Sequence, residues 1–153
     1  RPGIFQGNGG GSNAPAGYHL NAVTGAQTSF DDCNADPARC PVATTNPSTG
    51  ALTQNFLIAF TTGAEKFGCP TASTPCTPPF SPIEFELAPV GGAFVQQQVT
   101  FFGWAGFVGQ EQANIRITED TPPGEKRLKV TVPANSNLFG SDQRLVVHLG
   151  PAN

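Results

Sequence analysis

Charged residues are scarce in this sequence. Asp, Glu, Lys and Arg make up 12% of the 153 residues, and the formal net charge is −3, whereas about 25% charged residues is typical of soluble domains. Lysine occurs only three times, and phosphate binding requires clustered Lys and Arg, so no nucleic-acid partner is expected. The surface must instead be covered by Gln, Asn, Thr, Ser, Gly and Pro, which hydrate well but let neighbouring copies approach with little repulsion.

Methionine and long apolar runs are absent as well. Because the chain begins at Arg1 without an initiator methionine, we expect that an upstream segment has been removed. A secretory signal peptide is the commonest such segment, and an expression tag or a longer pro-segment is the alternative. The longest apolar stretches, Phe56–Phe60 and Phe101–Val108, fall far short of the roughly 20 residues that a bilayer helix requires. No membrane span is expected.

The four cysteines form two pairs of equal spacing. Six residues separate Cys33 from Cys40, and six separate Cys69 from Cys76. Local pairing closes the shortest loops at the lowest entropic cost, so we expect two disulfides, each worth at most about 2–3 kcal/mol. Zinc is the weaker alternative, because its ligand cysteines usually have about two to four residues between them and neither histidine is close to either pair. Two disulfides predict a secreted, extracellular or cell-surface protein.

The N-terminal residues differ in composition from the rest. Residues 1–17 show no hydrophobic periodicity and include four glycines between positions 7 and 11. This composition predicts a flexible N-terminal arm ahead of a single domain over residues 18–153. Ile4 and Phe5 lie at the tip of the arm, where they are the candidate assembly residues, docking either on the same subunit or on the next.

The pattern over the rest of the chain is that of β-strands. Apolar residues alternate with polar ones, and no segment of ten or more residues shows a helical period. The predicted strands are 55–62, 83–87, 95–101, 114–118, 128–132 and 145–149. Turn-forming residues predict long loops over residues 18–50 and 69–82, each pinned by one disulfide, with room for two short helical turns. The sequence therefore predicts an all-β fold, an antiparallel β-sandwich or jelly-roll-like single domain.

No pattern predicts catalysis. The G-x-S-x-G nucleophile motif is absent, and His19 and His148 are expected at the surface. Glu84 and Glu86 share a strand face, with Cα atoms about 6.5–7 Å apart, a spacing that glycoside cleavage can use. Any solvated strand produces the same pair, so we predict no catalytic residue and no cofactor.

A weak calcium candidate lies near the first cysteine pair. Asp32, Asn34 and Asp36 match the first three oxygen-ligand positions of a calcium loop. Pro37 and Ala43 stand where that motif requires glycine and glutamate. A plain turn cluster explains the pattern better, and no metal is predicted.

An aromatic group is the candidate ligand platform. Trp104, Phe102 and Phe107 lie close together in the sequence and could stack on a sugar ring. Phenylalanine dominates the aromatic set, with twelve copies against one Trp and one Tyr. This imbalance favours packing in the core over carbohydrate recognition.

These observations favour a secreted, non-catalytic structural or adhesive subunit that self-associates in an extracellular filament, coat or matrix through its arm. Copies of itself are the expected partners. The alternative is a monomeric extracellular module that binds carbohydrate, such as a polysaccharide, or another surface. A small secreted hydrolase is the third and least favoured class.

Overall fold

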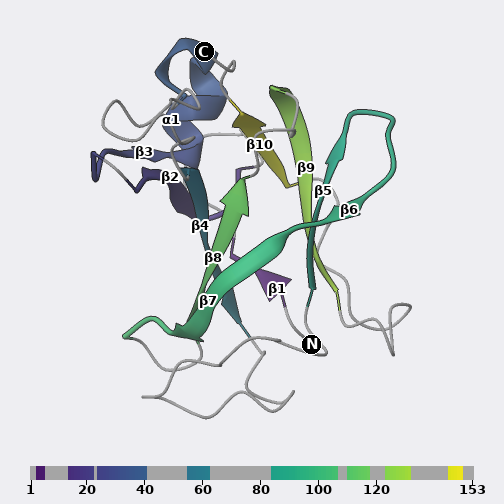
Figure 1. Ribbon diagram of the computed structural model, residues 1–153. Coiled ribbons are helices and arrows are strands. Elements are labelled where there is room, and N and C mark those ends of the chain that lie inside the picture. The colour runs from purple at the N-terminus through teal and green to yellow at the C-terminus, as the bar shows by residue number, and fades with distance from the viewer. Residues whose placement is uncertain are drawn as a thin grey trace, which may run out of the picture.

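The computed structural model describes residues 3–5, 14–22, 24–40, 55–62, 84–106, 110–117, 123–131 and 145–149. These residues are mostly β-strands, arranged in two antiparallel sheets with one short α-helix and one 3-10 helix (Figure 1). The β-rich prediction is thereby confirmed. The sandwich or jelly-roll topology stays a prediction.

The larger sheet has six strands. Five of them lie in the order β3-β2-β4-β8-β7, and β1 pairs with the end of β4 that β2 leaves unpaired. Its members are β1 (Gly3–Ile4), β2 (Gly17–Asn21), β3 (Gln27–Ser29), β4 (Asn55–Thr62), β7 (Gln98–Trp104) and β8 (Glu111–Ile117). The smaller sheet has four strands in the order β10-β9-β5-β6. Its members are β5 (Glu84–Pro89), β6 (Val95–Gln96), β9 (Gly124–Thr131) and β10 (Val146–Leu149).

One cluster of buried side chains unites the two sheets. The six-stranded sheet contributes Leu57, Ala59, Phe102, Ala113 and Ile115, and the four-stranded sheet contributes Phe85, Leu87, Leu128, Val130, Val147 and Leu149. These residues occupy alternate positions on their strands, as period two requires. The rings of Phe85 and Phe102 lie 6.0 Å apart between centroids and bring the sheets into contact.

A segment of the chain lies against each side of the pair of sheets. On one side, a continuous run of chain leaves the four-stranded sheet at Gln96 and enters the six-stranded sheet at Gln98. The amide of Gln97 donates to the carbonyl of Phe85 at 2.8 Å and fixes this passage. On the other side, helix α1 (Phe30–Ala35) lies beside β10, and the 3-10 helix η1 (Pro37–Arg39) follows it (Figure 1).

The prediction of one long loop over residues 18–50 is wrong for its first half. β2, β3, α1 and η1 occupy this part of the chain, because pairing with β4 supplies hydrogen bonds that the local sequence does not reveal. Its turn-forming residues act as helix caps instead. Ser29 Oγ accepts the amide of Asp32 at 3.0 Å, and Asp36 Oδ1 accepts the amide of Ala38 at 3.1 Å.

The disulfide between Cys33 and Cys40 is present, with a Cα–Cα distance of 4.7 Å. It joins α1 to the residue that follows η1, as local pairing predicts. Cys69 and Cys76 lie outside the described residues, so the second disulfide stays a prediction. No helix in the described part of the chain is long and apolar enough to span a bilayer.

Candidate interaction surfaces

The N-terminal strand β1 lies against its own chain. Gly3 pairs with Thr62 and Ile4 with Thr61, and Ile4 packs on the edge of the core. Phe5 extends this contact by two backbone hydrogen bonds. Its amide donates to the Phe60 carbonyl at 2.9 Å, and its carbonyl accepts from the Ala16 amide. The Phe5 side chain is 40% exposed. Within this one chain, Ile4 and the backbone of Phe5 thus lie against their own subunit.

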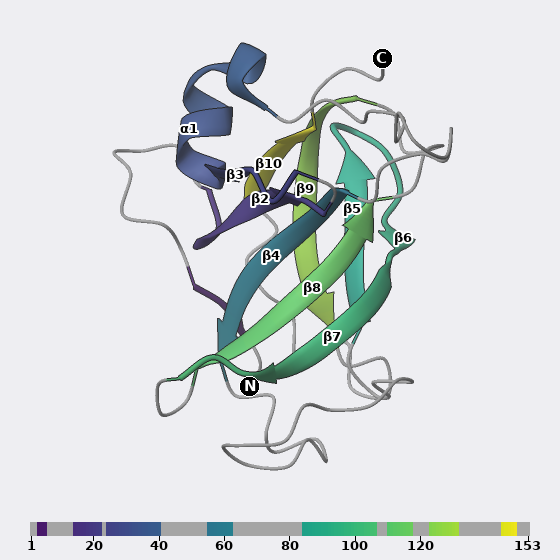
Figure 2. The same cartoon turned by 60° about the vertical axis from the view of Figure 1, so that its left-hand side comes forward.

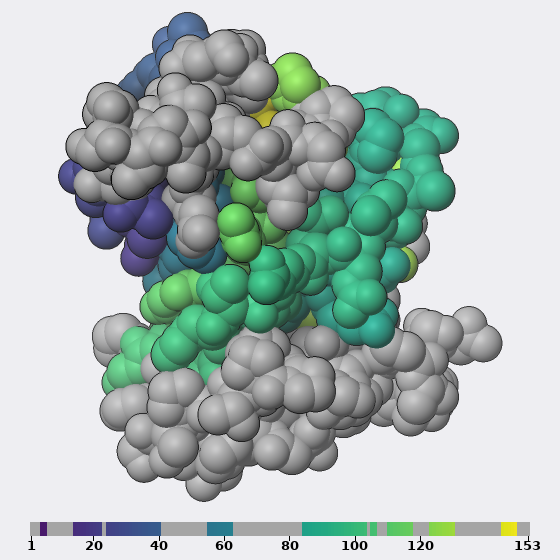
Figure 3. Space-filling model, viewed as in Figure 1, coloured from purple at the N-terminus to yellow at the C-terminus, as the bar shows by residue number. Residues whose placement is uncertain are grey.

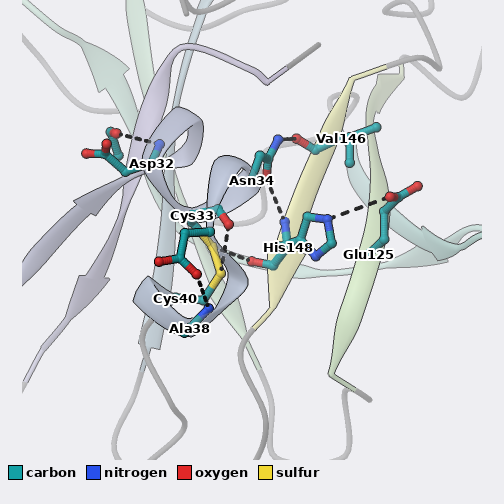
Figure 4. Close-up of a disulfide and its surroundings, with 10 residues drawn as sticks. Asp32, Cys33, Asn34, Ala38, Cys40, Glu125, Val146 and His148 are labelled. Atoms are coloured by element: carbon teal, nitrogen blue, oxygen red, sulfur yellow. Dashed lines mark hydrogen bonds and ion pairs between the residues drawn. A yellow bond between two sulfur atoms is a disulfide. The ribbon is translucent and has the colours of Figure 1, made fainter. Parts of the chain in front are cut away.

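The free edge of β10 is covered by helix α1. Asn34 Nδ2 donates to the carbonyl of Val146 at 2.7 Å, and Asn34 Oδ1 accepts the amide of His148 at 3.0 Å (Figure 4). A side-chain amide has one donor group and one acceptor, so Asn34 substitutes here for the backbone of a further strand. Cys33 Sγ lies 3.1 Å from the His148 carbonyl, which places the disulfide directly against this edge. Another chain has no access to this edge while α1 is in place.

Strand β7 is the other long edge. Among the described strands it has a neighbour only on its β8 side, and its green-teal atoms reach the molecular surface (Figure 3). The strand has no charged residue. A register shift between Val99 and Phe101 interrupts its pairing with β8, and such bulges discourage pairing with another edge.

The outer face of the six-stranded sheet, on the side away from the core cluster, has an ordered arrangement of side chains. Cross-strand register places them in rows. One row is Ser29, Tyr18, Ile58, Asn114 and Phe101, the next is Gln27, Leu20, Phe56, Arg116 and Gln98, and a shorter row is Phe60, Gln112 and Gly103. Figure 2 shows β4, β8 and β7 side by side, with the four-stranded sheet behind them. Aromatic and aliphatic side chains thus lie beside a strip of amides.

The contacts on this outer face hold its polar groups in place. Gln112 Nε2 donates to Asn114 Oδ1 at 2.7 Å, and Arg116 donates to Gln98 Oε1 at 3.5 Å. Tyr18, Phe56, Phe60 and Phe101 are half-buried, and Ile58 is fully buried. The rings of Tyr18 and Phe60 lie 6.4 Å apart at 60°. Arg116 is the only charged residue in the three rows.

The expectation that His19 lies at the surface is wrong. His19 stands opposite Leu57 on the inner face of the six-stranded sheet and is 2% exposed. Its ring meets Phe30 edge-on at 5.0 Å. Burial, and to a smaller extent the proximity of His148, lowers the pKa of His19 to about 4. The imidazole is therefore a neutral part of the core at physiological pH.

His148 faces outward on β10, as the alternation predicts. Its Nε2 lies 3.6 Å from Glu125 on the neighbouring strand (Figure 4). Glu84 and Glu86 do share the outer face of the four-stranded sheet. Glu86 pairs with Lys129 at 2.8 Å, and the Lys129 ammonium lies 4.2 Å from the centre of the Phe94 ring. These contacts form a structural cross-strand network.

The calcium candidates serve three separate structural tasks. Asp32 Oδ1 accepts from Arg39 at 3.0 Å, Asn34 binds β10 as described above, and Asp36 caps η1. Within the described ranges, no three His, Cys, Asp or Glu side chains are grouped as metal ligands would be.

Phe102 is the only member of the candidate aromatic platform whose side chain lies in the described part of the structure, and it packs in the core, the alternative that the sequence favoured. Phe102 is fully buried between the sheets, so its ring is not accessible to a surface ligand. The backbone of Trp104 ends β7. The Trp104 side chain and the whole of Phe107 lie outside the described residues.

The sequence contains one sign of the apolar outer face. Phe56–Phe60 is apolar at every position, which means that both faces of this strand are apolar. Leu57 and Ala59 face the core, whereas Phe56, Ile58 and Phe60 face outward. The row partners on β7 and β8 could not be found this way, because register between distant strands is not visible in periodicity.

In the described part of the chain, fold and surfaces together define a two-sheet, all-β protein with a disulfide-bonded α-helix and an outer sheet face that carries one charged residue, Arg116. Comparison with models of protein families, with curated protein sequences and with solved structures finds no match.

Proposed function

We propose that this protein is a secreted, non-catalytic structural or adhesive subunit that self-associates by exchanging its N-terminal strand. In the assembly, residues 3–5 of one copy take the place beside β4 of the next copy. The subunit is a β-sandwich or jelly-roll-like domain with a second disulfide between Cys69 and Cys76. The observed disulfide is compatible with an extracellular protein.

The observation that carries this proposal is the size of β1 and the nature of its connection. The strand has two residues and pairs with β4 at its Thr61–Thr62 end. Between this strand and Ala14 stand Gly7, Gly9, Gly10 and Gly11, and glycine permits many backbone conformations. A short strand on such a connection can be exchanged at low cost.

The free-energy difference between the closed arm and the exchanged arm is small. Burial of a whole isoleucine side chain stabilises by about 1.5–3 kcal/mol, and Ile4 is only partly buried. Opening the arm loses this contact and a few backbone hydrogen bonds, and an identical site on a neighbouring copy restores all of them. Concentration therefore decides between the closed and exchanged forms.

The scarcity of charge supports association between copies. With 12% charged residues and a net charge of −3, two copies repel each other weakly. Edge pairing through β10 is not part of the proposal, because Asn34 occupies that edge. Exchange of β1 requires no new edge, since it reuses an existing pairing.

A cysteine pair across the β1–β4 register tests the exchange. Gly3→Cys with Thr62→Cys places two cysteines opposite each other, where Cα separations of about 4.5–5.5 Å permit a disulfide. Oxidation at low concentration should give monomers with an internal crosslink. Oxidation at high concentration should give crosslinked multimers on non-reducing gels. The single variants Gly3→Cys and Thr62→Cys have one added thiol each, so they should give no internal crosslink and no crosslinked species larger than a dimer.

Two results would count against the proposal in different ways. Multimers in light scattering without intermolecular crosslinks would disprove exchange of the arm and leave another interface. A protein that stays monomeric at every concentration would disprove self-association itself.

A further inference from the structure

We propose that the outer face of the six-stranded sheet binds a neutral polysaccharide, along the rows of side chains that cross β2, β4, β8 and β7. This binding function is additional to self-association and does not depend on it. The face contains half-buried rings and carries one charged residue, Arg116, among thirteen row positions.

The chemistry of the side chains selects the class of ligand. Sugar rings present apolar C–H faces and rows of hydroxyl groups, so their binding sites need aromatic surfaces next to planar hydrogen-bonding groups. Tyr18 and Phe60 supply rings from adjacent strands of the face, with centroids 6.4 Å apart. Gln112 and Asn114 follow on the next strand in the same two rows.

The amides are positioned before any ligand arrives. The bond between Gln112 Nε2 and Asn114 Oδ1, at 2.7 Å, fixes both side chains. Gln112 Oε1 and Asn114 Nδ2 then provide acceptor and donor capacity side by side. Neighbouring hydroxyls of a sugar ring present the complementary donor and acceptor.

The spacing of the rows fits an extended chain. Adjacent strands are about 4.8 Å apart, which is close to the length of one pyranose unit in an extended polysaccharide. A chain lying across the strands therefore advances by about one strand per sugar, and it contacts the partly exposed side chains on either side of the buried Ile58. No carboxylate lies in the three rows, and Arg116 is their single cationic side chain. One positive charge among thirteen positions favours a neutral ligand over a polycation or a polyanion.

Titration of the ¹⁵N-labelled full chain by NMR tests this inference. The probes are cellohexaose, laminarihexaose, xylohexaose and mannohexaose, with a hexamer of polygalacturonate as the acidic comparison. We expect at least one neutral probe to shift the amide signals of β2, β4, β8 and β7, and to leave those of β5, β9 and β10 unchanged. The acidic probe should bind more weakly than that neutral probe.

Variants of the face should weaken binding without loss of the fold. Tyr18→Ala with Phe60→Ala should weaken it by roughly 10-fold or more. Gln112→Ala changes an outward polar side chain and should weaken it by roughly 3- to 10-fold. Val95→Ala is the matched control, because Val95 is 60% exposed on the other sheet, and its affinity should equal that of the wild type.

Three outcomes would overturn the inference. One is the absence of binding to all four neutral probes at millimolar concentration. The second is binding with shifts confined to other regions, such as the loop after Trp104. The third is full affinity in both the Tyr18/Phe60 and the Gln112 variants. Loss of copy-to-copy association in these variants, with sugar affinity intact, would identify the face as a self-interface instead.

Discussion

His19 gives the stability of this protein a specific dependence on pH. Its pKa is about 4 in the folded protein against 6.5 in an unfolded chain, so below pH 6.5 the unfolded state takes up a proton that the folded state resists. The resulting loss of stability grows as the pH falls and levels off below about pH 4, where it reaches roughly 3 kcal/mol.

Urea unfolding at pH 7, 5.5 and 4 measures this loss. His19→Gln removes the titrating group, so the variant should lose less stability than the wild type between pH 7 and pH 4. Equal losses in the two proteins would show that His19 does not titrate as its burial requires.

Gly17 is a position where only glycine fits. Its φ is +146°, and a Cβ atom there would collide with the backbone carbonyl of Ile58 and approach the Phe30 ring to 2.7 Å. We expect Gly17→Ala to destabilise the protein by at least about 2 kcal/mol. Gly25→Ala is the matched control, since Gly25 also has a positive φ, +73°, but no atom lies within 4 Å of its added Cβ.

The midpoints of chemical denaturation measure the stability lost in Gly17→Ala and in Gly25→Ala. Gly25→Ala should cost only the backbone penalty of about 1 kcal/mol. Similar costs for the two variants would contradict the close approach of Gly17 to β4.

Asn34 supplies two hydrogen bonds to the outer edge of strand β10. Asn34→Ala removes both the bond to the Val146 carbonyl and the bond from the His148 amide. We expect a loss of about 1–3 kcal/mol in unfolding free energy and faster hydrogen exchange at the His148 amide. Asn34→Asp keeps an acceptor for His148, so that amide should exchange more slowly than in Asn34→Ala. Unchanged exchange in both variants would mean that Asn34 does not protect the edge.

The elements differ in how far the sequence predicts them. β4, β5, β8, β9 and β10 follow from their apolar patterns, because each has residues that must face the core at every second position. The disulfide at Cys33 follows from spacing alone. Short helical turns were expected in the loops, but six residues give too short a pattern to place α1. β2 and β3 were not predicted, and the inner face of β2 carries His19 and Asn21 rather than apolar residues. The partners of Asn34 lie 112 and 114 residues away in the sequence, so no local pattern predicts its role.

At the scale of the whole molecule, the β10 edge is held firmly, whereas β1 is held weakly. The β10 edge is closed by α1 and its disulfide, whereas β1 completes the six-stranded sheet by only two paired residues. Among the described strands, only β6 has a pairing as short as that of β1, with two residues paired in each. Removal of residues 1–5 should therefore abolish association while the two sheets stay folded, as checked by circular dichroism.

Light scattering coupled to size-exclusion chromatography, run over a wide range of protein concentration, tests self-association most directly. For the full chain we predict a mass that rises with concentration above the monomer value of 15.9 kDa, and for the chain without residues 1–5 a constant monomer mass. A constant 15.9 kDa for the full chain at every concentration, or undiminished association without the arm, would contradict the proposed exchange.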